Sequence, residues 1–464
     1  MISANKHFLK NALSLFSLLV SGALLFSSCK KDIAGSSTGT TDSTTTNTNS
    51  AVNDTAWLYA QEIYLWYNYL PSSFNAQSYS DPNAVMEAIR AYSTESGFSD
   101  PVDKWSFAIK QTEWDDVSAG ISGDFGIGIF FNAANDLRVS YVEPASPAAA
   151  AGITRSWRIM SVDGNTTINT EDATIERIVA AVYSSSSTAF VFRRPDNTDT
   201  SITLAAATYT ADPFLLDTVY TVGANKVGYM VYNSFLGDVT AVKNQFSTIF
   251  SDFSSKGITD LIVDLRYNSG GYVDLQNELA NYLVPTAGNS AVMLKESFND
   301  KYSSYYDTTI YYVKKGALNL SRIFFITATN TASASELLIN SLKPYMDVKL
   351  VGRSTYGKPV GYFGIPDGDW YIFPISFRSV NSNGEGNYFD GMTPDAVVND
   401  GLEEQWGDVT EDCLGSALNY ISNGVFSNIA SRNASDVLIN SGNKQLGGNR
   451  FNGAVTNRKF SGIK

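Results

Sequence analysis

The sequence predicts a multidomain α/β protein, and three patterns support that prediction. Residues 323–326 form an apolar run rich in β-branched and aromatic side chains, helical spacing follows over residues 337–345, and residues 347–351 extend again. This order is that of a βαβ unit, the repeating element of an α/β core. Residues 54–93 carry aromatic side chains at helical spacing, whereas residues 124–194 contain short alternating runs separated by turns. A helical region and a β-rich region are therefore expected ahead of the core.

The composition agrees with a globular protein that carries extensions. The chain has 464 residues, of which 44% are hydrophobic and 13% aromatic, so it is long enough for about three domains with cores of their own. The formal net charge of −13 argues against nucleic acid as a partner. Two cysteines are too few for a disulfide framework, and we expect Cys413 to be a half-buried helix residue.

Residues 1–28 have the pattern of a secretory signal. Lys6 and Lys10 precede an apolar stretch over residues 13–26, and two serines then lead to Cys29. The junction resembles a bacterial lipoprotein signal, in which the cysteine becomes the acylated first residue of the mature chain. A plain signal peptide and an uncleaved anchor are the alternatives. Removal of the signal, with its two lysines and no acid, would change the net charge from −13 to −15.

Residues 29–52 are rich in Gly, Ser, Thr and Asn, and they are predicted to form a flexible tether. The lipoprotein resemblance implies that lipid at Cys29 holds the protein in the bacterial cell envelope. The expected place is the outer membrane, with the protein facing the periplasm or the cell surface.

Residues 53–110 are predicted to form a small N-terminal helical module. Aromatic residues at helical spacing are most often packing residues, so no ligand is assigned to this module. It is followed by a β domain over residues 111–208.

The middle of this β domain resembles a PDZ domain. S-P-A-A-A-A-G-I at residues 146–153 and I-M-S-V-D-G at residues 159–164 carry the resemblance. Loop glycines without side chains let backbone N–H groups turn toward a peptide carboxylate, while the next strand offers an open edge. The residues expected to bind a peptide are Phe125, Gly126, Ile127 and Gly128. A β domain that packs as a lid and binds nothing is the alternative.

The α/β core is expected over residues 209–422. Residues 261–266 read as a buried strand, and Gly270 and Gly271 follow in the loop at its C-terminal end. Ligand sites in open α/β sheets gather at the C-terminal ends of strands, so this loop is expected beside Ser333. Turn chemistry alone would also explain the paired glycines.

A serine and a lysine are predicted to meet in this core. The helix that follows Ser333 and the strand after it would return the chain to the same sheet edge, where Lys358 emerges. The sole histidine, His7, lies in the predicted signal, so a Ser-His-Asp triad is excluded from the mature chain. A lysine held neutral by burial can act as the base instead. Ser333 and Glu336 also fit a helix capping box, and a capping serine with a solvated lysine is the alternative.

The same residues resemble the C-terminal processing (tail-specific) serine peptidases. T-A-S-A-S-E at residues 331–336, with Lys358 in a Y-G-K context 25 positions after Ser333, carries the resemblance, which covers about residues 54–422. It implies a helical module, a PDZ domain and a crotonase-like core of the ββα type. It also implies that Ser333 is the nucleophile and Lys358 the base. The implied oxyanion donors are in the glycine loop and at the next residue: Gly270, Gly271 and Ala334. No cofactor or metal is expected.

The chain departs from the family pattern after the lysine. Many members have a glycine next and a glutamine four residues after the lysine, whereas this chain has Pro359 and Tyr362. The hydroxyl of Tyr362 is the candidate for orienting the lysine, although an aromatic residue in a strand is more often a packing residue. Residues 423–464 are predicted to be a polar tail without enough large apolar residues to contribute to a core.

These patterns together predict a serine endopeptidase of the envelope or the extracellular space. Its expected partners are protein or peptide substrates, gripped by their C-terminal ends, and a membrane that holds its lipid. Two alternatives stay open: a catalytically silent peptide-binding lipoprotein that retains the peptidase fold, and an esterase.

Overall fold

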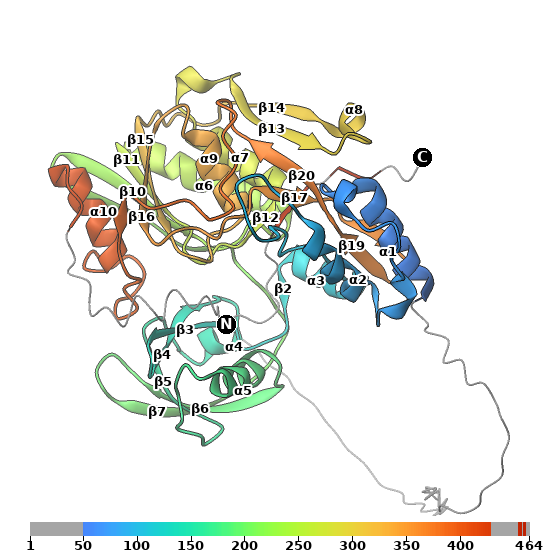
Figure 1. The fold of residues 1–464 in the computed structure, drawn as a ribbon. Helices are drawn as coiled ribbons and strands as arrows, with labels where there is room; N and C mark the ends of the chain where they lie inside the picture. The colour runs from blue at the N-terminus through green and yellow to red at the C-terminus, as the bar shows by residue number, and fades with distance from the viewer. Residues whose placement is uncertain (1–49, 428–452, 457, 461–464) are drawn as a thin grey trace, which may run out of the picture. The chain divides into compact units, whose positions relative to one another are not determined.

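The computed structural model describes residues 50–427, 453–456 and 458–460, and at its centre lies a six-stranded sheet (Figure 1). The strand order is β21-β16-β15-β11-β10-β9, in which β9 is antiparallel to β10 and the other pairs are parallel. The strands are β9 (Phe214–Val222), β10 (Asn225–Tyr232), β11 (Asp260–Asp264), β15 (Arg322–Thr327), β16 (Asp347–Gly352) and β21 (Ala396–Val397). Helix α9 (Ala334–Leu342) connects β15 to β16, so the predicted βαβ unit is confirmed.

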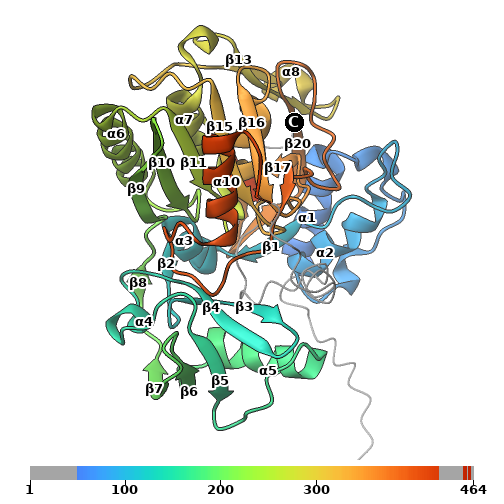
Figure 2. The ribbon, with the colours of Figure 1, turned by 90° about the vertical axis from the view of Figure 1, so that its left-hand side faces the viewer.

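Helices cover both faces of this sheet. One face packs against α6 (Val239–Lys256), α7 (Val273–Leu283) and α9 in the largest hydrophobic core. The other face packs against α10 (Asp412–Asn423), which lies across the strands in Figure 2. Successive strand residues point to opposite faces, so the strands of this sheet are apolar on both sides.

A second six-stranded sheet carries the loops that surround the site described below. Its order is β12-β22-β17-β20-β13-β14. The strands are β12 (Gly270–Tyr272), β13 (Val292–Phe298), β14 (Thr308–Tyr311), β17 (Val360–Tyr362), β20 (Ile375–Val380) and β22 (Gly453–Val455). The helices η4 (Thr286–Gly288) and α8 (Ser303–Tyr306) lie in its connections.

Strand β22 corrects the expectation for residues 423–464. The predicted polar tail was given no part in a core, yet β22 lies inside the second sheet and buries Val455. A strand is held by backbone hydrogen bonds to its neighbours, and a short Gly-Ala-Val run forms these without large apolar side chains. Low apolar content therefore does not exclude a strand that adds to an existing sheet.

The N-terminal module is helical, as predicted, but it is completed by strands from the core. Its helices are α1 (Ser50–Ile63), η1 (Tyr67–Tyr69), η2 (Ala76–Ser78), α2 (Pro82–Ile89) and η3 (Arg90–Tyr92). Strand β1 (Phe107–Lys110) pairs with β19 (Trp370–Phe373), which pairs with β18 (Ile365–Asp367). Helix α3 (Gln111–Ala119) falls in the range expected for the β domain, yet its Trp114 packs into the core of the module.

The β-rich domain has a hydrophobic core of its own. Its antiparallel sheet has the order β3-β4-β5-β6-β7, and β3 is an edge strand. The elements are β3 (Ile127–Ala133), β4 (Asp136–Val142), α4 (Pro147–Ala150), β5 (Arg158–Val162), α5 (Asp172–Tyr183), β6 (Ser187–Arg193) and β7 (Asp199–Ala205). The chain enters and leaves this domain through a two-stranded ribbon of β2 (Ile121–Ser122) and β8 (Tyr209–Thr210).

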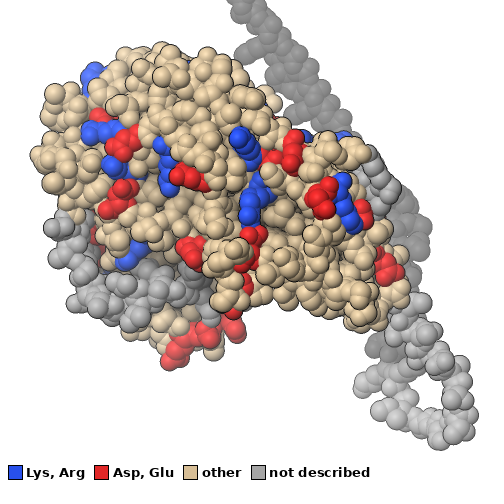
Figure 3. Space-filling view, turned by 45° about the horizontal axis from the view of Figure 1, so that its top comes forward, with Lys and Arg blue, Asp and Glu red and all other residues tan. Residues whose placement is uncertain are grey.

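The surface carries charges of both signs. Figure 3 shows basic and acidic side chains interspersed on one face among a larger uncharged area. Among the helices of the described residues, none is both long enough and apolar enough to cross a membrane.

Candidate active site

Ser333 stands at the turn between β15 and α9. Its φ of 57° and ψ of −107° lie outside the regions that an L side chain prefers, so the turn is strained. The side chain is fully buried. Its Oγ faces the start of α9 in a capping-box arrangement, but it makes no hydrogen bond of normal geometry with the described residues. A strained turn and an unengaged hydroxyl are features of a nucleophile more than of a helix cap.

Glu336 joins the Ser333 turn to the Lys358 loop. Its Oε2 accepts hydrogen bonds from the backbone N–H groups of Ser333 and Lys358, both at 2.8 Å. Its Oε1 accepts from the Thr355 hydroxyl at 2.6 Å and from the Gly357 N–H at 2.7 Å. Burial raises the pKa of the Glu336 carboxyl, although these hydrogen bonds act in the opposite direction. Because one oxygen holds both backbone nitrogens, the two predicted catalytic residues lie next to each other.

From the sequence alone, Glu336 is expected only to cap the helix. The feature that indicates its larger role is the burial of the helix around it. All nine residues of α9 are buried, so a carboxylate in this helix needs several hydrogen-bond donors from other segments.

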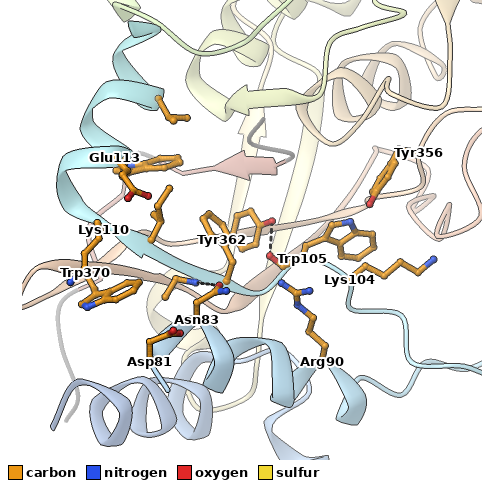
Figure 4. Close-up of a pocket in the computed structure, with 15 residues that line it drawn as sticks. Asp81, Asn83, Arg90, Lys104, Trp105, Lys110, Glu113, Tyr356, Tyr362 and Trp370 are labelled. Atoms are coloured by element: carbon orange, nitrogen blue, oxygen red, sulfur yellow. Dashed lines mark hydrogen bonds between the residues drawn. The ribbon is translucent and has the colours of Figure 1, made fainter. Parts of the chain in front are cut away.

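Lys358 is fully buried and points to Tyr362. Its Nζ donates a hydrogen bond to the Tyr362 hydroxyl, and it lies 3.8 Å from the centroid of that ring and 5.4 Å from that of Trp105. The Tyr362 hydroxyl donates in turn to the backbone carbonyl of Trp105 at 3.2 Å (Figure 4). Tyr362 therefore lies where the sequence predicted a lysine-orienting group. No hydrogen bond between Lys358 Nζ and Ser333 Oγ is formed in this arrangement.

The surroundings of Lys358 favour its neutral amine. Burial lowers the pKa of Lys358 well below its ordinary value; the carboxylates of Asp103 and Glu336 oppose this shift, and the guanidinium of Arg90 adds to it. Burial also raises the pKa of Tyr362 well above its ordinary value, so its hydroxyl stays protonated. A lysine that is held neutral in this way is able to act as a base.

The glycine loop touches the serine. A Cβ atom added at Gly270 would lie 3.1 Å from the Cβ of Ser333, and one at Gly271 would lie 2.3 Å from the backbone of Phe235. Both glycines have positive φ, 106° and 140°, so a side chain is excluded at both positions by space and by conformation.

The three expected oxyanion donors are not equivalent. The N–H of Gly270 donates to the Asn268 side chain at 3.0 Å, so it is engaged within the chain. The N–H of Ala334, the first residue of α9, has no hydrogen-bond partner among the described residues. A helix N-terminus also favours negative charge, so Ala334 is the better placed donor.

A buried ion cluster holds the start of the glycine loop and joins it to the β-rich domain. Arg155 of that domain donates to Asp400 Oδ1 at 2.6 Å, and Arg266 donates to the same oxygen at 2.7 Å. Tyr267 donates to the other oxygen of Asp400. Burial opposes ionisation, but Arg155 and Arg266 lower the pKa of Asp400 to about 2. Sequence reasoning missed this cluster, because Asp400 lies 245 positions from Arg155 and 134 from Arg266.

A pocket of about 540 Å³ lies between the N-terminal module and the core, against Trp105 and Tyr362 (Figure 4). Its aromatic walls are Trp105, Phe107, Trp114, Tyr356, Tyr362 and Trp370. Arg90, Lys104 and Lys110 also line it, with Asp81 and Glu113 as the acidic residues. Since Trp105 and Tyr362 contact both the pocket and the lysine amine, a group bound in the pocket would lie close to the reacting atoms.

The residues predicted to bind a peptide lie at the edge of the β-rich domain. Phe125 is fully buried, and the N–H of Gly126 donates to Asp124 at 2.8 Å. Ile127 and Gly128 begin β3, which pairs only with β4 within the described part of the chain. The unpaired edge of β3 therefore begins at Ile127 and Gly128, both of which are buried, and the N–H of Gly126 is taken up by Asp124. Cys29 lies outside the described residues.

Two family models match parts of the chain. Residues 226–398 match the model of peptidase family S41, and residues 51–107 match that of the peptidase S41 N-terminal domain. The chain is 25% identical over 307 residues to a carboxyl-terminal-processing protease of Picosynechococcus, covering 64% of this chain and 70% of the relative. It is 26% identical over 270 residues to the carboxy-terminal processing protease CtpB of Bacillus subtilis, covering 57% of this chain and 53% of that relative.

A solved structure shows the same fold. An S41 protease from Bacteroides fragilis superposes with a TM-score of 0.63 at 23% identity, covering 79% of this chain and 96% of its own. The match to the peptidase family contains both Ser333 and Lys358. The match to the N-terminal domain ends at Phe107, the first residue of β1. The chain is therefore similar to the peptidases of family S41, with a match to the N-terminal domain of that family ahead of the match to its peptidase domain.

Proposed function

We propose that the protein is a serine endopeptidase in which Ser333 and Lys358 form the catalytic dyad. The observation that carries this proposal is the shared Glu336 oxygen, which sets the strained serine next to a buried lysine whose pKa is lowered. The test is whether Ser333→Ala loses peptide hydrolysis while Ser335→Ala retains it. Tyr362 supplies a partner for the lysine in place of the family glutamine, so the departure from the pattern does not favour a silent binding protein.

The reaction follows from these positions. Lys358 Nζ turns from the Tyr362 hydroxyl to accept the proton of Ser333, whose Oγ attacks the carbonyl carbon of the substrate. The Ala334 N–H, with Gly271 as the second candidate donor, stabilises the oxyanion of the tetrahedral intermediate. Lys358 then passes the proton to the leaving amine, and an acyl-enzyme forms at Ser333. Water releases the acyl group by the same steps in reverse, with Lys358 again as the base.

The proposed substrates are proteins or peptides gripped by their C-terminal ends. The two relatives are named for carboxyl-terminal processing, and the open edge of β3 at Ile127 and Gly128 is suited to an added strand. In this proposal the β-rich domain has the role of a PDZ domain. A substrate amidated at its C-terminus would then be cleaved more slowly than the same substrate with a free carboxylate.

We also propose that the protein is a lipoprotein of the bacterial cell envelope, anchored through Cys29. Each buried CH₂ of an acyl chain contributes about 0.8 kcal/mol to membrane binding, so several chains would hold the protein permanently. Cys29→Ser is expected to lose incorporation of a fatty-acid analogue and to leave the membrane fraction or keep its signal. Cys413→Ser is the matched control, because Cys413 is buried in the core. A wild-type protein that incorporates no label would contradict the proposal.

The pocket against Trp105 and Tyr362 is the proposed subsite for a large aromatic or apolar side chain of the substrate. Val117 on α3 is half-buried and lines it. Val117→Phe would fill part of the pocket. For a peptide whose Phe side chain enters the pocket, kcat/KM should therefore fall roughly 10-fold or more. For the same peptide with Ala in place of that Phe, kcat/KM should change little.

A peptide series with Phe moved through each position measures this effect. Val425→Phe is the matched control, because Val425 is 60% exposed and lies outside the pocket. An equal loss for the Phe and Ala peptides, or none for either, would show that the pocket does not select side chains.

A further inference from the structure

A segment of the chain itself lies between the two parts of the active site. Strand β22 pairs in parallel with β12, the strand of the glycine loop, with Gly453 opposite Gly270. On its other side it pairs with β17, with Val455 opposite Tyr362. The slot between the oxyanion loop and the strand that carries the lysine-holding tyrosine is therefore filled by backbone from a distant part of the sequence.

This segment lies against the reacting groups. The carbonyl oxygen of Gly453 is 2.5 Å from the place where a Cβ of Gly270 would stand, and Ser333 Cβ is 3.1 Å from the same place. The N–H of Gly453 donates to Ser269 O at 3.2 Å, and the N–H of Thr456 donates to Tyr362 O at 3.2 Å. Ser333 and Lys358 are each 0% exposed, so a substrate cannot reach them in this arrangement.

Two side chains beyond the strand anchor it. Arg458 donates to Tyr306 O at 2.7 Å and forms an ion pair with Glu296, whose side chain is 2% exposed. Burial raises the pKa of Glu296 to about 7 although Arg458 opposes the shift, so the ionised carboxylate that this ion pair needs predominates above neutral pH. Phe460 packs against four aromatic rings at centroid distances of 5.4 to 6.2 Å: Tyr59, Tyr302, Tyr306 and Phe363.

The contacts of the strand itself are of a kind that another peptide can replace. The strand is three residues long, and its first residue is a glycine. The pairing on both sides is by backbone, and backbone hydrogen bonds do not depend on sequence. An extended substrate segment could form the same bonds, and the covalent link gives the segment an advantage only through its effective concentration.

We propose that the slot between β12 and β17 is a binding site for an extended peptide with small side chains, occupied here by residues 453–456 as an internal competitor of the substrate. The inference rests on the proposed function, because the slot borders the Ser333 and Lys358 dyad. A substrate must displace this segment, so the Arg458 and Phe460 anchors set how often the site is open.

The first measurement does not need catalysis. In a Ser333→Cys background, the rate at which a thiol reagent modifies residue 333, located by mass spectrometry, reports access to the site. The double change Arg458→Ala and Phe460→Ala should raise this rate on the order of 10-fold, because it weakens the anchors and increases the open population. Lys459→Ala is the matched control, since Lys459 is exposed and lies between the two anchors.

The second measurement is kcat/KM for an unstructured substrate with Ser333 intact. The anchor variant should gain a similar factor, whereas Lys459→Ala should not. Faster modification without any hydrolysis by either protein would support the slot and refute the proposed dyad. Hydrolysis by the wild type with no gain in either measurement would refute the slot and leave the peptidase standing.

Hydrogen exchange of the unaltered chain covers the case in which the anchor variant does not fold. Amides of residues 453–456 should exchange faster than those of β15, because the segment opens without unfolding of the core. Equal protection in the two strands would show that β22 is a fixed part of the sheet and would overturn the inference.

Discussion

Ser333→Ala is expected to abolish hydrolysis of an unstructured protein substrate, with a loss of ~10⁴-fold or more in kcat. The strained turn presents the Ser333 hydroxyl without a hydrogen-bond partner among the described residues. The measurement is the rate of substrate cleavage, with thermal unfolding as a check that the variant folds.

Ser335→Ala is the matched control in the same turn. Its hydroxyl donates to Asn268 O at 3.0 Å, so it is engaged in holding the glycine loop. Loss of one such hydrogen bond costs about 1 kcal/mol, and activity should fall by roughly 10-fold at most. Equal inactivity of the two variants, or a wild type that never cleaves peptides, would remove the assignment of Ser333.

Lys358→Arg is expected to be nearly as inactive as Lys358→Ala. An arginine keeps the positive charge but does not lose its proton in a protein, so it cannot accept the proton of Ser333. Burial lowers the pKa of Lys358, and in the proposed mechanism the neutral amine is the active form. The value of kcat/KM should therefore rise with pH through this lowered pKa and level off above it.

The outcomes of the lysine experiment are distinct. Activity retained by Lys358→Arg would mean that the group acts through its charge and not as a base. A rate that stays flat from about pH 6 to 9 would also argue against proton transfer to Lys358 in the rate-determining step. A fall in rate with rising pH would contradict the sign expected for a base.

The βαβ unit that carries the site could be predicted from the sequence alone. The apolar run at residues 323–326 became β15 (Arg322–Thr327), and the periodicity that follows became α9 and β16. These elements are readable because hydrophobic periodicity reflects which face of a local element is buried. A sharp turn between this strand and α9, which carries Ser333, follows from the same pattern.

The sequence also placed Lys358 beside Ser333, because a βαβ unit returns the chain to the same sheet edge. It offered Tyr362 as a candidate partner of the lysine, but it did not reveal Glu336 as the group that holds both backbones. The role of Glu336 depends on its hydrogen-bond partners, and these are chosen by which segments meet in space.

The surroundings of Ser333 and Lys358 depend on contacts between distant segments of the chain. Tyr362 reaches a carbonyl 257 positions earlier in the chain, and Gly270 is covered by Gly453. Arg155 is buried against Asp400, although they lie in different domains. Such contacts leave no periodic trace in the sequence, because each depends on two segments whose local patterns are set independently. The physical reason is that hydrophobic periodicity records burial within one element, whereas buried polar groups are satisfied by whichever distant segments the fold brings to them.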